Sequence, residues 1–196
     1  MFMPNQFGSL EVIAGCMSSG KSEELIRRLK RATIAKQKVL VFKPQIDVRG
    51  EQSAIASRDG RMYEAIPINE PLDVFTHWQE DCRVVAFDEA QFFTEQIMAV
   101  VRQLLDRGVR VLIAGLDTDF RGEPFGAIPQ LMALADSVTK LNAVCVCCAQ
   151  PAIRTQRLID GQPAPYDSPR IVVGGDEMYE ARCRKCHLVP TADSEG

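Results

Sequence analysis

The sequence lacks several features that would place it in a specialised class of protein. No apolar run reaches the roughly 20 residues that a membrane-spanning helix needs. The N-terminus, MFMPNQFGSL, has no basic start followed by an apolar stretch, as an export signal would have. There is no internal repeat and no low-complexity tract, and the net charge is only −3, so no strong overall field would attract a nucleic-acid backbone. We therefore expect a cytoplasmic protein that binds neither a membrane nor nucleic acid.

What the sequence does have is the balance of a folded globular protein. Of its 196 residues, 46% are hydrophobic and 25% are charged, and this combination argues against disorder. Only residues 21–38 are locally basic, and a helix with one solvated basic face explains that run without a polyanionic ligand. The length suits one main domain with room for a small second lobe.

Short apolar runs alternate with segments of helical periodicity through residue 114. Such alternation is typical of a mostly parallel sheet with helices on both faces, so the predicted fold class is α/β. The apolar runs predict strands at 10–14, 38–42, 83–87 and 109–114, and the periodic segments predict helices at 23–36, 71–80 and 95–107.

An eight-residue motif, GCMSSGKS, joins the first predicted strand to the first predicted helix. It matches the phosphate-binding pattern G-x-x-x-x-G-K-S, whose backbone N–H groups curl around phosphate oxygens at a helix N-terminus. Lys21 would reach the β- and γ-phosphates, and Ser22 would bind Mg²⁺. An incidental glycine-rich turn is the alternative. The predicted ATP-binding residues are Gly15, Cys16, Met17, Ser18, Ser19, Gly20, Lys21 and Ser22.

Two carboxylates, Asp88 and Glu89, follow the buried strand predicted at 83–87. Adjacent residues at a strand end point to opposite sides, so the pair can serve two different groups. Asp88 would hold Mg²⁺ through its water shell, and Glu89 would take a proton from the nucleophile. The same pair could instead cap a helix. It also leaves open whether the nucleophile is water, as in an ATPase, or an alcohol, as in a kinase.

Six of the seven cysteines lie in close groups or in the phosphate loop. Two C-x-x-C pairs predict a four-thiolate zinc site, with the long segment between the pairs looped out and tied at both ends. Cys147 is then a bystander and His187 a further candidate ligand, while a redox dithiol or unpaired structural cysteines are alternatives. The predicted zinc ligands are Cys145, Cys148, Cys183 and Cys186.

The character of the chain changes after Lys140, where cysteines, prolines and glycines replace helical periodicity. We therefore predict a P-loop nucleotide-binding domain at 1–142, a zinc-binding domain at 143–188 and a flexible tail at 189–196.

Five segments together resemble the zinc-containing thymidine kinases, the type shared by bacteria and the animal cytosolic enzyme. They are GCMSSGKS, FDEAQFF at 87–93, GLDTDFRGEPF at 115–125, the two C-x-x-C pairs, and VVGGDEMYEARCRKCH at 172–187. The resemblance implies a P-loop (RecA-like) sheet with a small zinc-binding lasso lobe that closes over the nucleoside. It implies transfer of the γ-phosphate of ATP to the 5′-hydroxyl of thymidine with Mg²⁺, in a homotetramer, and so favours a kinase over an ATPase. Deoxyuridine is a possible second substrate, and the pathway would be pyrimidine deoxynucleotide salvage.

The resemblance also implies roles for individual residues. Glu89 matches the catalytic base, and Asp47 and Arg49 match a segment that approaches the metal and the phosphates. The nucleotide site would extend over Asp88, Glu89, Ala90 and Gln91. The thymidine pocket would be formed by Phe120, Phe125, Thr155, Val172, Val173, Gly174 and Tyr179. Without the resemblance, packing in the core would be the better explanation of the three aromatic residues.

Two other functions fit parts of the sequence. A zinc-knuckle NTPase that binds nucleic acid and uses ATP as a switch would account for the cysteine pairs and the basic helix. A related deoxynucleoside kinase with a different base preference would account for all five segments.

Overall fold

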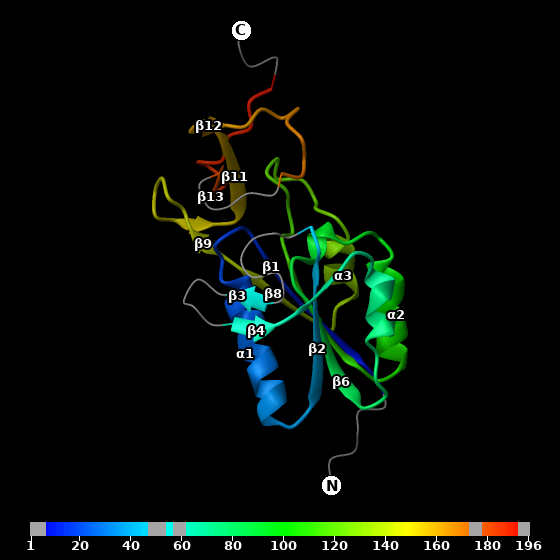
Figure 1. Cartoon of the computed structure of the whole chain (residues 1–196). Helices are drawn as coiled ribbons and strands as arrows, with labels where there is room; N and C mark the ends of the chain where they lie inside the picture. Colours follow the sequence, from blue (N-terminus) through cyan, green and yellow to red (C-terminus); the bar gives the residue numbers. More distant parts are fainter. Residues whose placement is uncertain (1–6, 47–53, 57–61, 173–177, 192–196) are drawn as a thin grey trace.

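The structure is a computed structural model that describes residues 7–46, 54–56, 62–172 and 178–191. Figure 1 shows a central sheet flanked by helices and a smaller, mostly β-stranded lobe at one end of it. Four of the predicted site residues, Asp47, Arg49, Val173 and Gly174, lie outside the described residues.

Six parallel strands form the central sheet, in the order β5-β2-β6-β7-β1-β8. Because the strands are parallel, the segments that follow them all emerge at one edge of the sheet, where α/β proteins bind their ligands. The strands are β1 Ser9–Gly15, β2 Lys38–Pro44, β5 Ile66–Ile68, β6 Cys82–Phe87, β7 Arg110–Gly115 and β8 Ser137–Leu141. A short antiparallel pair, β3 Ala54–Ala56 and β4 Met62–Glu64, lies apart from this sheet.

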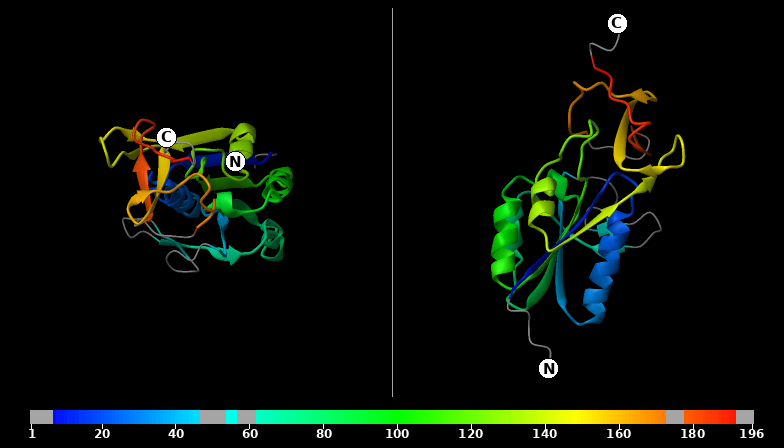
Figure 2. Two further views of the ribbon diagram at one scale, coloured as in Figure 1. Left: turned by 90° about the horizontal axis from the view of Figure 1, so that it is seen from above. Right: turned by 180° about the vertical axis from the view of Figure 1, so that it is seen from behind.

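Helices cover both faces of the sheet, as the two views in Figure 2 show. Helix α1, Lys21–Ile34, lies on one face, and α2, Ile97–Asp106, and α3, Ile128–Leu134, lie on the other. Side chains alternate along each strand, so that Ile13 packs in the cluster that holds α1 and Val12 in the cluster that holds α2 and α3. Both clusters are fully buried along the strands, as the continuous apolar runs predict for a doubly covered sheet.

The structure confirms the predicted α/β class and four of its strands. The segment predicted as a helix at 71–80 is a shorter 3₁₀-helix, η1, over Pro71–Thr76. Reciprocal hydrogen bonds between Glu70 and Asp73 cap its N-terminal end. A second 3₁₀ turn, η2, spans Ala90–Phe92. Helix α3 and strand β8 are not among the predicted elements, because a seven-residue helix and a partly exposed edge strand give little periodic signal.

The small lobe, by which we mean β9 to β13, follows the last strand of the sheet. Its centre is β11, which pairs antiparallel with both β12 and β13. The strands are β9 Ala143–Val144, β10 Pro151–Ala152, β11 Arg154–Ile159, β12 Gln162–Pro163 and β13 Tyr179–Arg182. This lobe lies over the sheet edge where β1 ends (Figure 1).

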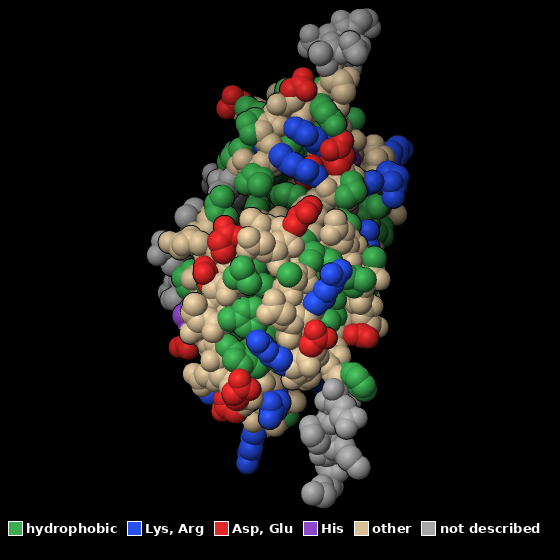
Figure 3. All heavy atoms as spheres, turned by 90° about the vertical axis from the view of Figure 1, so that its right-hand side faces the viewer, with side chains coloured by type: hydrophobic (Ala, Val, Ile, Leu, Met, Phe, Trp, Pro, Cys, Tyr) green, Lys and Arg blue, Asp and Glu red, His purple; other side chains and the backbone are tan. Residues whose placement is uncertain are grey.

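The described helices are all too short or too polar to cross a bilayer. Figure 3 shows the side of the molecule that carries α2, where basic, acidic and hydrophobic side chains are interspersed. This face carries no large patch of a single charge that would suit a polyanion.

Candidate active site

The loop that follows β1 has the shape of a phosphate cradle. Gly20 has a φ of 85°, in the left-handed region that favours glycine, and a Cβ on Gly15 would collide with the carbonyl oxygen of Leu141. Helix α1 begins directly afterwards at Lys21. Since Gly20 has no side chain with which to cap α1, the first N–H groups of the helix are left for an anion.

Lys21 and Ser22 connect this loop to the end of β6. The Lys21 side chain is 9% exposed, and its Nζ donates a 2.8 Å hydrogen bond to the carbonyl oxygen of Cys16. Burial lowers the pKa of Lys21, against the attraction of Glu89 and other nearby negative charge. Ser22 Oγ lies 3.5 Å from Asp88 Oδ2. A hydroxyl and a carboxylate are oxygen ligands of the kind that Mg²⁺ prefers, so this pair fits the metal predicted there.

The chain turns sharply between β6 and η2. Glu89 has φ 49° and ψ 38°, a left-handed conformation that costs a residue with a side chain roughly 1–2 kcal/mol. Its N–H donates to Asp88 Oδ1 at 3.0 Å, and its carboxylate accepts a 2.5 Å hydrogen bond from Gln91 Nε2. Ala90 packs into the main core, so only its backbone is available to a ligand. Strain of this kind is enriched at functional sites, although Lys36, Ala149 and Asp160, in turns away from this site, also have a positive φ.

A pocket lies between the phosphate loop and the small lobe, and it contains every described residue that was predicted to bind the nucleoside. Met17, in the phosphate loop, also lines it, and the Met17 N–H donates a 3.0 Å hydrogen bond to Thr155 Oγ1. The hydroxyl of Tyr179 donates to the carbonyl oxygen of Val172 at 2.7 Å. The predicted residues in the pocket are Phe120, Phe125, Thr155, Val172 and Tyr179.

Five further residues line the same pocket, and the sequence patterns assign no role to them: Phe92, Leu116, Asp119, Arg170 and Ile171. Phe92 meets Phe125 edge to face, with 5.9 Å between ring centroids, whereas its neighbour Phe93 packs in the core against Phe87. The FDEAQFF segment contains both phenylalanines, but its pattern does not say which of them reaches the ligand.

Asp119 and Arg170 form an ion pair in the pocket wall. Arg170 Nε lies 2.7 Å from Asp119 Oδ2, and the guanidinium stands over the Phe125 ring at 5.4 Å. The other oxygen of Asp119 accepts backbone N–H bonds from Arg121 and Glu123, so the carboxylate is fully buried but well satisfied. These residues are 51 positions apart, and nothing in the local sequence indicates that they meet.

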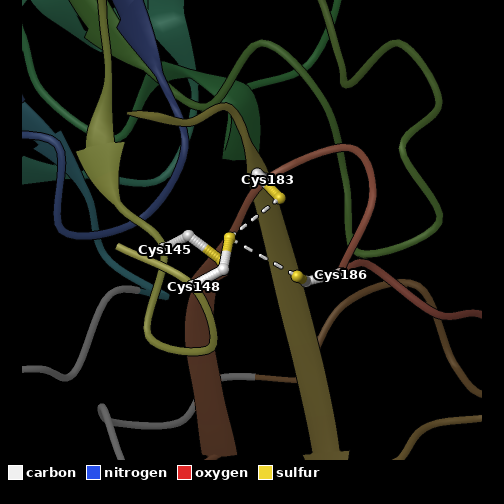
Figure 4. Close-up of side chains that lie close together, drawn as sticks. All are labelled: Cys145, Cys148, Cys183 and Cys186. Carbon is white, nitrogen blue, oxygen red and sulfur yellow. Dashed lines mark hydrogen bonds between the residues drawn. The ribbon is translucent and has the colours of Figure 1, made fainter. Parts of the chain in front are cut away.

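The four predicted zinc ligands come together in the small lobe, with their sulfur atoms all within 4.8 Å of one another (Figure 4). Cys148 Sγ lies 3.6 Å from the sulfur atoms of both Cys183 and Cys186. Four thiolates at zinc–sulfur distances of about 2.3 Å would lie about 3.8 Å apart in a tetrahedron. Although burial opposes it, hydrogen bonding to neighbouring backbone groups lowers the pKa of Cys145 to about 6, whereas hydrogen bonding to the neighbouring sulfur atoms raises the pKa of Cys186 to about 12. The cluster therefore fits zinc.

The remaining candidates for this chemistry lie elsewhere. His187 Nε2 is 2.8 Å from the carbonyl oxygen of Phe120, and the ring is not in the cysteine cluster. Cys147 is exposed and also stays outside it. Cys16 is buried, bonds to the Ala152 carbonyl oxygen at 3.3 Å, and has a pKa raised by that burial, so it is not an activated thiol.

A protein-family model described as thymidine kinase matches residues 8–187 of this chain. The match begins just before β1 and ends just after the second cysteine pair, so it takes in the sheet, the phosphate loop, the pocket and the cysteine cluster. It covers well over half of the 196 residues.

Proposed function

Because the chain belongs to the thymidine kinase family, we propose that it transfers the γ-phosphate of ATP to the 5′-hydroxyl of thymidine to give dTMP. The observation that carries this proposal is that the phosphate loop and the aromatic pocket share Met17. A phosphate donor in the loop and a nucleoside in the pocket would therefore lie against each other. Such adjacency is what phosphoryl transfer requires.

The donor side of the reaction is assigned to residues at the ends of β1 and β6. Gly15 to Ser22 would hold the phosphates through backbone N–H groups, with Lys21 as the charge partner of the transferred group. Ser22 and Asp88 would hold Mg²⁺, which neutralises phosphate charge when it is bound. Asp47 and Arg49 stay predictions of a further contribution to this side.

The acceptor side is assigned to the aromatic pocket. Phe92, Phe120 and Phe125 would give a flat pyrimidine its apolar walls, and Thr155 and the backbone around Val172 would supply the polar contacts to its edge. Tyr179 would lie on the sugar side, and Val173 and Gly174 stay predicted contacts to the base. Glu89 would take the proton of the 5′-hydroxyl, because its carboxylate stands at the end of β6 close to Lys21.

The small lobe would exclude water from the pocket, which favours transfer to an alcohol over hydrolysis of ATP. We assign the small lobe the role of the lasso in this family. In this assignment residues 143–188 form the zinc-binding domain and residues 189–196 form a tail. A cytoplasmic homotetramer that acts in pyrimidine deoxynucleotide salvage, and that also accepts deoxyuridine, completes the proposal on the basis of family membership.

The decisive experiment is a radiolabel transfer assay with Mg·ATP and a panel of nucleosides. Thymidine should be phosphorylated well above the purine nucleosides and cytidine, and no transfer to thymidine would refute the proposal. Glu89→Gln should lower kcat by about 10²–10⁴-fold while ATP still binds. Retention on single-stranded DNA that weakens steeply with salt would instead support the nucleic-acid switch.

A further inference from the structure

Gln91 is a buried polar residue whose side chain joins two parts of the site. Only 3% of its surface is exposed. Its Nε2 donates to Glu89 Oε2 at 2.5 Å, and its Oε1 accepts a 3.0 Å hydrogen bond from the backbone N–H of Leu116. Glu89 follows β6 and Leu116 follows β7, so one amide connects the segments that follow two neighbouring strands.

The orientation of that amide is fixed by its partners. A backbone N–H can only donate, so the oxygen of Gln91 must face Leu116. The nitrogen then faces Glu89, and an ionised carboxylate there can only accept. Both ends of the amide are therefore matched in a single orientation, and rotating it by 180° would place oxygen against oxygen and N–H against N–H.

Two glycines leave the space that Gln91 occupies. A Cβ on Gly115 would lie 2.7 Å from Gln91 Oε1, and one on Gly126 would lie 2.6 Å from the Gln91 carbonyl oxygen. Gly126 also has a φ of 53°, which disfavours a side chain there. These positions give Gln91 a close-fitting niche at the end of β7.

Glu89 needs such a support because of where its backbone places it. It sits in a left-handed turn, where the strand no longer fixes its direction. A flexible carboxylate loses rotamer freedom when it is held in one position, and a buried amide that is itself held on both sides imposes that restriction before substrate binds. The amide holds the Glu89 carboxylate at a fixed position relative to the end of β7. Leu116, which follows β7, lines the aromatic pocket.

We propose that Gln91 is a positioning residue, which holds the Glu89 carboxylate at a fixed position relative to the nucleoside pocket by bridging it to the backbone of Leu116. This inference rests on the proposed function, since that function makes Glu89 the base. It gives Gln91, which the resemblance places in the nucleotide site, a role that it exerts through Glu89.

A double-mutant cycle tests the proposal with thymidine and Mg·ATP. Gln91→Met keeps the length of the side chain but removes both hydrogen bonds, and we expect kcat to fall by about 10–100-fold. The KM for thymidine and the affinity for ATP should stay within about twofold, because the Gln91 amide bonds to Glu89 and to the Leu116 backbone and its side chain does not line the aromatic pocket. In the Glu89→Gln background, Gln91→Met should cause no further loss of kcat.

The matched control is Gln156→Met, which removes another buried glutamine whose amide bonds to backbone groups of Arg157 and Leu188. Its effect on kcat should multiply with that of Glu89→Gln. If the effects of Gln91→Met and Glu89→Gln on kcat multiply, the proposal is overturned. Weaker ATP binding with unchanged kcat in the Gln91→Met variant would also overturn it. If Glu89→Gln alone keeps full turnover, it is the base assignment in the proposed function that fails.

Gln91→Asn is a second variant in case the methionine variant is unstable. Its neutral amide keeps a polar group in the niche but is one methylene too short to reach both Glu89 and the Leu116 N–H. We expect a loss of kcat of tenfold or more in protein that still unfolds in one cooperative transition above the assay temperature. Wild-type kcat in this variant would overturn the proposal.

Discussion

The hydroxyl of Thr155 accepts a hydrogen bond from the backbone N–H of Met17, with 3.0 Å between Oγ1 and N. The small lobe therefore touches the phosphate loop itself and not only the nucleoside pocket. A second contact, from Cys16 Sγ to the carbonyl oxygen of Ala152, runs parallel to it. Changes in the small lobe should accordingly be felt at the ATP site.

Thr155→Val should weaken binding of both substrates. Valine has the shape of threonine but leaves the Met17 N–H without its partner, at a cost of about 1–3 kcal/mol. We expect KM to rise for thymidine and for ATP, measured by steady-state kinetics with each substrate varied in turn. Thr94→Val, at an exposed threonine, should leave both constants unchanged. A rise confined to thymidine would show that the contact does not shape the phosphate loop.

Cys183→Ser should remove the metal and destabilise the chain. Freshly purified wild type should carry one zinc per chain, and the variant should carry much less. Loss of a metal staple worth a few kcal/mol would lower Tm by about 10 °C in a chain of this length. Cys147→Ser, at the exposed cysteine outside the cluster, should keep both the zinc and the Tm. Metal analysis that finds no zinc in the wild type would exclude the site.

Arg170→Met should raise the KM for thymidine more than it lowers kcat. The change removes the ion pair with Asp119 in the pocket wall but keeps an apolar stem over Phe125. We expect about a tenfold increase, equivalent to about 1.4 kcal/mol, with the KM for ATP unaffected. Arg184→Met, on the exposed turn between Cys183 and Cys186, is the control. An equal effect on both substrates would argue for general unfolding of the small lobe.

Glu24 should make the fold sensitive to acid. Hydrogen bonding from Arg27, aided by Arg28, lowers the pKa of Glu24 from 4.5 to about 2. A carboxyl with a depressed pKa stabilises the folded state above its unfolded pKa, so this contribution is complete above about pH 4.5 and is lost as the pH falls to about 2. Thermal melts should show a lower Tm for Glu24→Gln than for the wild type at neutral pH. This difference in Tm should vanish as the pH approaches about 2. The matched control is Glu95→Gln, at an exposed position, which should have a Tm close to that of the wild type at neutral pH.

The parts of the site that the sequence predicts are those with a local signature. The phosphate loop, the carboxylates after β6 and the cysteine pairs each need a few residues at fixed spacing, and such spacing is visible in one dimension. The aromatic pocket could also be predicted, but only through resemblance to a family. By residue type alone, Phe120 and Phe125 look like core residues.

The parts that escaped prediction depend on contacts between distant segments. The bond from Leu116 to Gln91 spans 25 positions, and the pair of Asp119 with Arg170 spans 51. Neither contact leaves a pattern in the chain, because its two partners lie in separate segments and no spacing within one segment shows that they meet. The short helix α3 and the edge strand β8 escaped for a different reason, namely that their periodic signals are too brief.

The position of β1 in the sheet has a consequence for the order of events during synthesis. Although β1 is made first, it pairs with β7 and β8, and Gly15 is in register with Leu141. Contacts of such long sequence separation form slowly, because the intervening chain must be ordered first. The phosphate-binding motif therefore lacks its framework until β8, which ends at Leu141, has been synthesised. We expect nucleotide to stabilise the motif only after β8 has joined the sheet.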